Sequence, residues 1–168
     1  MKVVRAILPV LVRIAVVAAA AVAVYRFSWI PYNCNRDAKT NAAMTLKALD
    51  ASPVDASALA QRNLRIIDAS LNRCGRDASE LMLAAANYRL ANQREQAIEA
   101  YRQALGVDQR PEIYLELGLT QLSVGNRREG VSNITRAARF AEQYMYEAGD
   151  PTVIDEVRAN LGLPRLPR

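Results

Sequence analysis

Residues 78–111 read ASELMLAAANYRLANQREQAIEAYRQALGVDQRP, and residues 111–144 read PEIYLELGLTQLSVGNRREGVSNITRAARFAEQY. Placed over each other from residues 78 and 111, an offset of 33 residues, the two stretches match in residue type. The small, large apolar and turn positions coincide in these pairs: Ala85 with Gly118, Ala97 with Gly130, Ala104 with Ala137, Leu81 with Tyr114, Ala84 with Leu117, Tyr101 with Ile134, and Asn92 with Gly125. A period of ~34 residues is typical of helical hairpins that stack. Such hairpins stack because one hairpin cannot bury its apolar face alone.

This pattern resembles the tetratricopeptide repeat (TPR), which places a bulky, a small and an aromatic residue on its first helix and small and apolar residues on its second. The first copy supplies Leu81, Ala85, Tyr88, Ala97, Tyr101 and Ala104. The second copy supplies Tyr114, Gly118, Gly130, Ile134 and Ala137. The copies depart from the family at Gln109, where proline is usual, and at Gln121, where an aromatic residue is usual. The alternative is a plain helical bundle whose spacing matches by coincidence.

Helix start and stop signals punctuate the repeats. Asp77 with Glu80, and Asn126 with Glu129, have the spacing of a capping box at a helix start. Pro111 suits a first helical turn, and Gly125 suits a helix end. Gly149 is expected to close the helix that begins after Asn126, and Asp150-Pro151 to open a last helix that covers the end of the stack.

Upstream of the repeats, the sequence predicts one more hairpin. Its first helix is expected over about residues 35–49, and Ser52-Pro53 with Asp55 marks the start of its second helix, which runs to Cys74-Gly75. The predicted fold class is therefore all-α: an N-terminal transmembrane helix, a short TPR-like solenoid of helical hairpins, and a C-terminal capping helix. The predicted parts are a membrane segment (1–32), a hairpin that is a degenerate repeat or a cap (33–76), two TPR-like repeats (77–148), and a capping helix with a tail (149–168).

The N-terminus has the composition of a membrane anchor. Residues 6–24 are apolar except for Arg13 and Pro9, and this length is about what a helix needs to cross a bilayer. Arg13 lies toward the N-terminal side of the stretch, where its long side chain reaches toward lipid headgroups or else pairs inside a complex. Aromatic residues follow the stretch as in an interfacial belt. The predicted interface residues are Arg13, Tyr25, Phe27, Trp29 and Tyr32.

A cleaved signal peptide is the main alternative to this anchor. In that interpretation residues 14–20 form the apolar core of the signal, and Ala21-Val22-Ala23 is the cleavage site. The long apolar segment before Arg13 and the aromatic residues after the supposed cleavage site favour the anchor.

Charge and cysteines indicate a location. The chain carries a net charge of +5, but four basic residues lie within the first 30 residues, which contain no acidic one, so the remainder is nearly neutral and we expect no nucleic-acid partner. Cys34 and Cys74 fall at neighbouring ends of the predicted first hairpin, so we expect a disulfide between them, with two unpaired thiols as the alternative. A disulfide favours an oxidising compartment. We therefore expect a single-pass protein of a bacterial inner membrane, with its repeats in the periplasm.

Catalysis is not expected. The chain has no histidine, its two cysteines lack the spacing of a metal or redox motif, and its glycines form no phosphate-binding loop. We predict no enzyme activity, no cofactor, no metal site and no small-molecule substrate.

The resemblance to the TPR family implies a partner-binding groove lined by the first helix of each repeat. Carried over position by position, the groove residues are Met82, Ala86, Arg89, Leu90, Glu112, Leu115, Leu119 and Leu122. The leucines form an apolar stripe for a helix or peptide of a partner, or else they pack against the chain's own helices. The expected function is a membrane-anchored scaffold or assembly factor for a cell-envelope complex that serves secretion, pilus, cytochrome-maturation or polysaccharide machinery. The alternatives are a secreted soluble adaptor and an accessory or structural subunit of a membrane enzyme complex.

Overall fold

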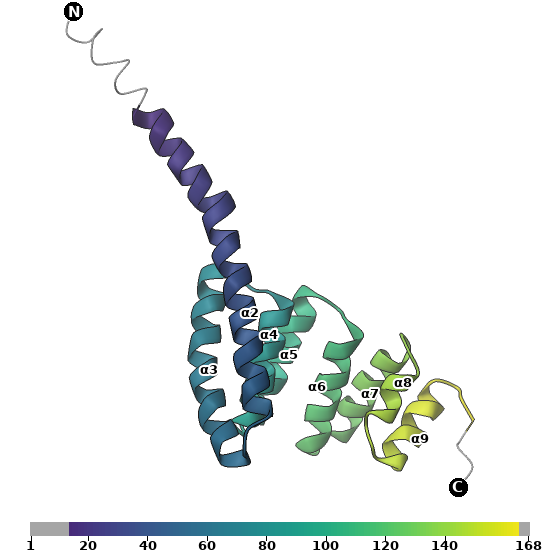
Figure 1. Cartoon of the computed structure of the whole chain (residues 1–168). Coiled ribbons are helices and arrows are strands. Elements are labelled where there is room, and N and C mark those ends of the chain that lie inside the picture. The colour runs from purple at the N-terminus through teal and green to yellow at the C-terminus, as the bar shows by residue number, and fades with distance from the viewer. Residues whose placement is uncertain (1–13, 165–168) are drawn as a thin grey trace, which may run out of the picture. The chain divides into compact units, whose positions relative to one another are not determined.

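The computed structural model of the protein describes residues 14–164, and every regular element in that range is a helix (Figure 1). The prediction of an all-α chain is confirmed. The chain divides into two compact units, Met1–Lys39 and Thr40–Arg168. The predicted interface residue Arg13 lies outside the described residues, as do the residues that precede it.

One helix runs without a break over Ile14–Leu49, and its second part is α2 (Ile30–Leu49). The sequence placed a helix start near residue 35, whereas the helix continues through this position. A single π-helical turn, η1 (Tyr25–Trp29), precedes α2, and the Ile30 N–H donates to the Tyr25 carbonyl. Pro31 follows directly; it has no N–H, and its ring would clash with the carbonyl four residues back in a regular helix. The wider turn lets the helix pass this proline.

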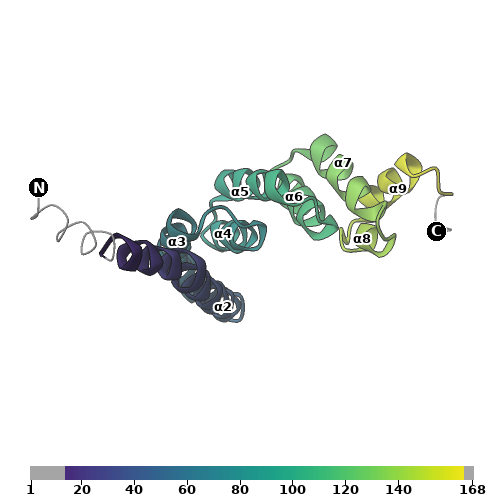
Figure 2. The ribbon, with the colours of Figure 1, turned by 90° about the horizontal axis from the view of Figure 1, so that it is seen from above.

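Helical hairpins follow one another along the second unit, as Figure 2 shows from α4 to α9. The helices are α3 (Pro53–Cys74), α4 (Ala78–Leu90), α5 (Arg94–Val107), α6 (Pro111–Ser123), α7 (Arg127–Ala138), α8 (Gln143–Tyr146) and α9 (Pro151–Asn160). The two helices of each predicted repeat, α4 with α5 and α6 with α7, make the most extensive helix contacts. The hairpins join through α3 against α4 and α5 against α6, so neighbours in sequence are neighbours in space.

The turns of the two repeats adopt matching conformations. Asn92 has a φ of 58° and Gly125, its equivalent 33 residues on, has a φ of 83°, so both adopt the left-handed conformation that ends a helix. The predicted N-caps at Asp77 and Asp150 are confirmed, since each side chain accepts backbone N–H groups of the following turn. The capping pair predicted at Asn126 is wrong, because its side chain makes no capping bond and Glu129 bonds elsewhere.

Small residues let the helices of each hairpin approach closely. Ala85 and Ala97 are completely buried in the first repeat, and Gly118 and Gly130 are buried in the second. A Cβ added to Gly118 would lie 2.9 Å from the Gly130 carbonyl oxygen, and one added to Gly130 would lie 2.9 Å from the Gly118 carbonyl oxygen. Real Cβ contacts are essentially never that short, so the α6–α7 backbone contact requires glycine at both positions.

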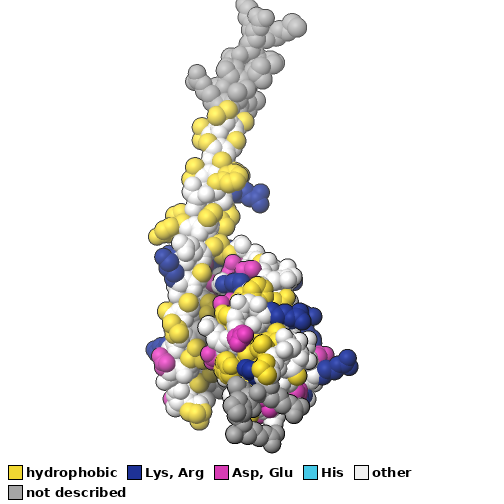
Figure 3. All heavy atoms as spheres, turned by 90° about the vertical axis from the view of Figure 1, so that its right-hand side faces the viewer, with side chains coloured by type: hydrophobic (Ala, Val, Ile, Leu, Met, Phe, Trp, Pro, Cys, Tyr) yellow, Lys and Arg dark blue, Asp and Glu magenta, His cyan; other side chains and the backbone are white. Residues whose placement is uncertain are grey.

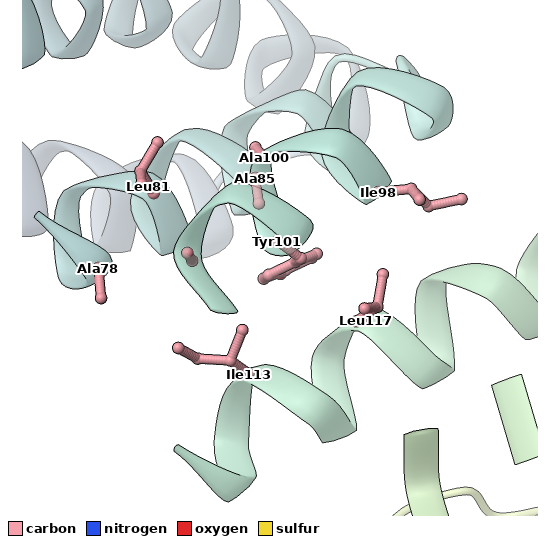
Figure 4. Packing of buried hydrophobic residues seen from close by; sticks show 9 residues of the cluster. Ala78, Leu81, Ala85, Ile98, Ala100, Tyr101, Ile113 and Leu117 are labelled. Atoms are coloured by element: carbon pink, nitrogen blue, oxygen red, sulfur yellow. The ribbon is translucent and has the colours of Figure 1, made fainter. Parts of the chain in front are cut away.

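The core of the first repeat is closed by the first helix of the second. Tyr101 of α5 is 2% exposed and packs among small side chains of α4 and the branched side chains of α6 (Figure 4). The buried members of this cluster are Ala78, Leu81, Ala85, Ile98, Ala100, Tyr101, Ala104, Ile113 and Leu117. A repeat therefore completes its core only with its neighbour, as expected for stacked hairpins.

The C-terminal end is covered by α8 and α9. The sequence predicted one helix up to Gly149, whereas α7 ends at Ala138 and the short α8 follows after a turn. This break places Met145 in the core with no exposed surface. Val153 and Val157 of α9 are also buried in the cluster that α7 shares, so α9 packs against the last hairpin.

Candidate functional site

The groove residues implied by the TPR resemblance form what we call the first-helix face, which comprises Met82, Ala86, Arg89 and Leu90 of α4 and Glu112, Leu115, Leu119 and Leu122 of α6. On α4, Met82, Ala86 and Leu90 are half-buried and Arg89 is exposed. These positions follow each other at three- and four-residue steps, so they lie along one side of the helix. The α4 part of the face therefore offers a shallow apolar surface with one cation.

The α6 part of this face is more deeply packed. Leu115 is only 8% exposed, and Leu119 and Leu122 pack against the cluster that contains Val131 and Met145. A Cβ at Gly130 would lie 2.8 Å from Leu122 Cγ, so Leu122 covers the backbone of α7. Leu115 therefore belongs to the core of the protein, while Leu119 and Leu122 are half-buried against it and Glu112 is exposed.

Polar pairs tie successive hairpins together beside this face. Arg89 of α4 bonds Glu116 of α6, and the Tyr101 hydroxyl donates to the same carboxylate at 3.4 Å. Burial, and after it the charge of Glu116, raises the pKa of Tyr101 to about 12, so this phenol stays protonated as a donor at neutral pH.

The Tyr144 hydroxyl donates to Glu112 at 2.8 Å. The pKa of Glu112 is lowered because its own backbone N–H and then Tyr144 donate to the carboxylate. These pairs fix the spacing of α4, α6 and α8.

A buried polar cluster lies where α2, α3 and α4 meet, and apolar spacing in the sequence did not indicate it. Its members, Asn41, Thr45, Asn63, Glu80 and Asn87, are all at most 5% exposed. Asn87 Nδ2 donates to Thr45 Oγ1 and to the Leu83 carbonyl, both at 2.8 Å, and Asn87 Oδ1 accepts from Asn63 Nδ2 at 3.0 Å. Asn41 Nδ2 donates to Glu80 Oε2 at 2.9 Å. Side chains bonded in this way fix which helix faces meet, because another pairing would leave more buried polar atoms unsatisfied.

A signal for this cluster exists in the sequence. Asn41, Thr45 and Ala48 are the buried residues of α2, and they recur at the spacing of one helix face. Apolar residues alone do not mark this face, since Leu46 and Leu49 of the same helix are 61% and 53% exposed. Glu80, which the sequence offered as a partner in the Asp77 capping box, belongs to the polar cluster instead.

The N-terminal part of the long helix is apolar and unpacked. Ile14–Leu49 is long and apolar enough to cross a membrane, and the most apolar stretch of this helix is 0% buried. In Figure 3 the part of this helix next to the grey residues is covered by hydrophobic and backbone atoms. The predicted belt residues Tyr25, Phe27, Trp29 and Tyr32 are 57–82% exposed.

The two cysteines are not free thiols. Cys34 and Cys74 are both disulfide-bonded. Within residues 14–164, no group of three or more His, Cys, Asp or Glu side chains is placed to hold a metal ion.

Comparison with known proteins gives no relative from which to carry over a function: no family model, no curated protein and no solved structure matches the chain.

Proposed function

We propose that this protein is a membrane-anchored scaffold of the TPR type, which holds a protein partner at a bacterial inner membrane. The observation that carries the proposal is the combination of two hairpins, closed through small residues at equivalent positions, with an exposed apolar helix ahead of them. Stacked hairpins of this kind create extended surfaces for other polypeptides. The scaffold role follows from those surfaces and from the lack of any catalytic constellation in the sequence.

The anchor is supported by exposure. Val16, Val17 and Val24 are 62%, 69% and 63% exposed, an unfavourable arrangement in water and the expected one in lipid. The disulfide-bonded cysteines favour the periplasmic side for the repeats, because disulfides persist in oxidising compartments. Tethering to a membrane raises the effective concentration of the scaffold next to other membrane proteins, so a shallow surface of modest affinity suffices.

The anchor makes a direct prediction. Val17→Arg should increase the fraction of the protein that alkaline carbonate extracts from membranes, because a charge within the span costs about 3 kcal/mol on insertion scales. Val107→Arg is the matched control: Val107 is 49% exposed but belongs to α5, so this variant should stay in the membrane like the wild type. Equal extraction of both variants would contradict the anchor. N-terminal sequencing that finds a mature start near Val24 would instead support the cleaved-signal alternative.

The scaffold role is tested by photo-crosslinking in membranes of the source organism. A crosslinking amino acid at Ala86, on the first-helix face of α4, should yield a discrete crosslinked protein. The same group at Gln96, an exposed residue of α5, serves as the control and should yield much less. Leu119→Asp should reduce the Ala86 product at least fivefold while far-UV circular dichroism shows intact helices. Equal products from both positions, or none at Ala86, would contradict a binding role for this face.

A further inference from the structure

Helix α7 and the residue that follows its end carry an arginine strip, which we define as Arg128, Arg136 and Arg139, all of them exposed. From Arg128 to Arg139 the strip spans eleven helical steps, or roughly 16 Å at the rise of an α-helix. The small side chain of Ser132 lies between its members and is exposed as well. The nearly neutral total charge of the folded part gives no indication of this strip.

Three hollows adjoin the strip. One of about 810 Å³ lies between α7 and α9, and Arg128, Ser132, Arg136 and Arg139 all line it. A second of about 490 Å³ lies between α7 and the helices α5 and α6, and it shares Arg128 and Arg136 with the first. A third of about 430 Å³ is lined by Tyr114, Arg136, Arg139 and Phe140, with Gln109. The strip is therefore the common edge of a continuous recessed surface.

The carboxylates near the strip are bonded to other residues. Glu156 accepts from Arg127 at 2.7 Å, and Glu129 accepts from Gln121 at 2.8 Å and lies 3.4 Å from Arg102. Among residues 14–164, no carboxylate forms an ion pair with an arginine of the strip. Arg136 instead lies over the Tyr114 ring, 5.7 Å from its centroid. Within the described part of the chain, none of the three charges of the strip is paired with a carboxylate, although Glu156 and Glu129 line the adjoining hollows.

The chemistry of the strip suits carboxylates on a polypeptide. The chain has no lysine after Lys47, so the positive charge here comes only from guanidinium groups, whose planar fork bonds a carboxylate through two parallel N–H groups. A length of ~16 Å matches about five residues of extended chain. The hollow beside Tyr114 and Phe140, whose side chain is 64% exposed, accepts an apolar side chain next to the charges. Nucleic acids fit less well, because ordinary binding uses about 6–10 phosphate contacts and the strip has three arginines.

We infer that this recessed surface of α7 is a docking site for an acidic segment of a partner protein, whose Asp and Glu carboxylates bind Arg128, Arg136 and Arg139 and whose apolar side chain enters the hollow at Tyr114 and Phe140. The arginines of the site lie on the second helix of its hairpin and at the end of that helix, Tyr114 lies on the first helix, and none of these residues belongs to the first-helix face. The site therefore stands or fails independently of the scaffold role proposed above.

The test uses the full chain in non-ionic detergent and a fluorescein-labelled peptide, Gly-Glu-Glu-Phe-Glu-Glu-Gly, followed by fluorescence anisotropy. Saturable binding is expected, and it should weaken as salt rises. The double variant Arg128→Gln/Arg139→Gln should weaken binding at least tenfold. Arg62→Gln/Arg65→Gln removes the same charge from exposed positions of α3 and should change binding less than twofold.

Three further arms of this experiment decide between ligand classes. The same peptide with Gln in place of Glu should not bind, and the peptide with Ala in place of Phe should bind more weakly than the parent. Phosphatidylglycerol added to the detergent micelles, and a single-stranded oligonucleotide, are the competing probes. The inference is overturned if the acidic peptide does not bind, if both double variants weaken its binding equally, or if phosphatidylglycerol or the oligonucleotide displaces it through the same arginines.

Discussion

Gly118→Val is expected to destabilise the folded unit by about 3 kcal/mol, the upper part of the range for overpacked helix contacts. The first atom added to this glycine would already lie 2.7 Å from Ile134 Cγ1 and 2.9 Å from the Gly130 carbonyl oxygen. The side chain of Ile134 is completely buried, so it has no space into which to move. The α6–α7 hairpin must therefore open to accept valine. Urea unfolding of the full chain in detergent, followed by far-UV circular dichroism, measures the effect.

Replacing two different glycines by alanine provides a matched control, because the two changes are expected to alter the stability of the protein in opposite directions. A Cβ added to Gly106 of α5 would have no neighbouring atom within 4 Å, so Gly106→Ala should stabilise the protein by about 0.5 kcal/mol through helix propensity. Gly118→Ala gains the same propensity but meets the α7 backbone, so it should destabilise by about 1 kcal/mol. Stabilisation by both alanines would show that α6 and α7 are not in close contact.

Asn87→Ala is expected to destabilise the protein by about 3 kcal/mol. Asn87 has no exposed surface and bonds Thr45, Asn63 and the Leu83 carbonyl. Its removal leaves the buried amide of Asn63 and the hydroxyl of Thr45 short of a partner, and each unsatisfied group costs about 1–3 kcal/mol. The loss should appear as a lower urea midpoint of the cooperative transition that includes α2, α3 and α4.

Asn72→Ala is the control for this variant, because Asn72 is an exposed residue of α3. It removes the same amide from the same region and should change stability by less than about 0.5 kcal/mol. If the two variants lose equal stability, the polar cluster does not connect the three helices.

The sequence predicted best the small residues and the turn positions that recur at the 33-residue offset. The pairs Ala85 with Gly118 and Ala97 with Gly130 are buried because hairpin closure requires small residues there, and Asn92 shares the left-handed turn of Gly125 because the same turn is needed twice. Helix starts at Asp77 and Asp150 were also predictable, since capping is a local interaction. Local signals of this kind do not depend on distant parts of the chain.

Features that arise from tertiary packing were not predictable in the same way. The end of α7 at Ala138 has no breaker residue, and the turn there follows from the burial of Met145. The polar cluster escaped a search for apolar spacing, although its α2 members lie on one helix face. The leucine stripe of α6 was identified correctly as apolar, and its spacing left open whether it binds a partner or packs against the chain's own helices; Leu115 is buried in the chain, and Leu122 lies against the α7 backbone.

The backbone contact between α6 and α7 is the feature on which the fold and the proposed function most depend. Nuclear magnetic resonance of the labelled full chain in detergent micelles tests it directly through the nuclear Overhauser effect between the Hα protons of Gly118 and Gly130. A strong cross-peak between the two glycines is expected, because each points at the carbonyl oxygen of the other at close range. Cross-peaks from these protons to water, with none between the two residues, would contradict this packing.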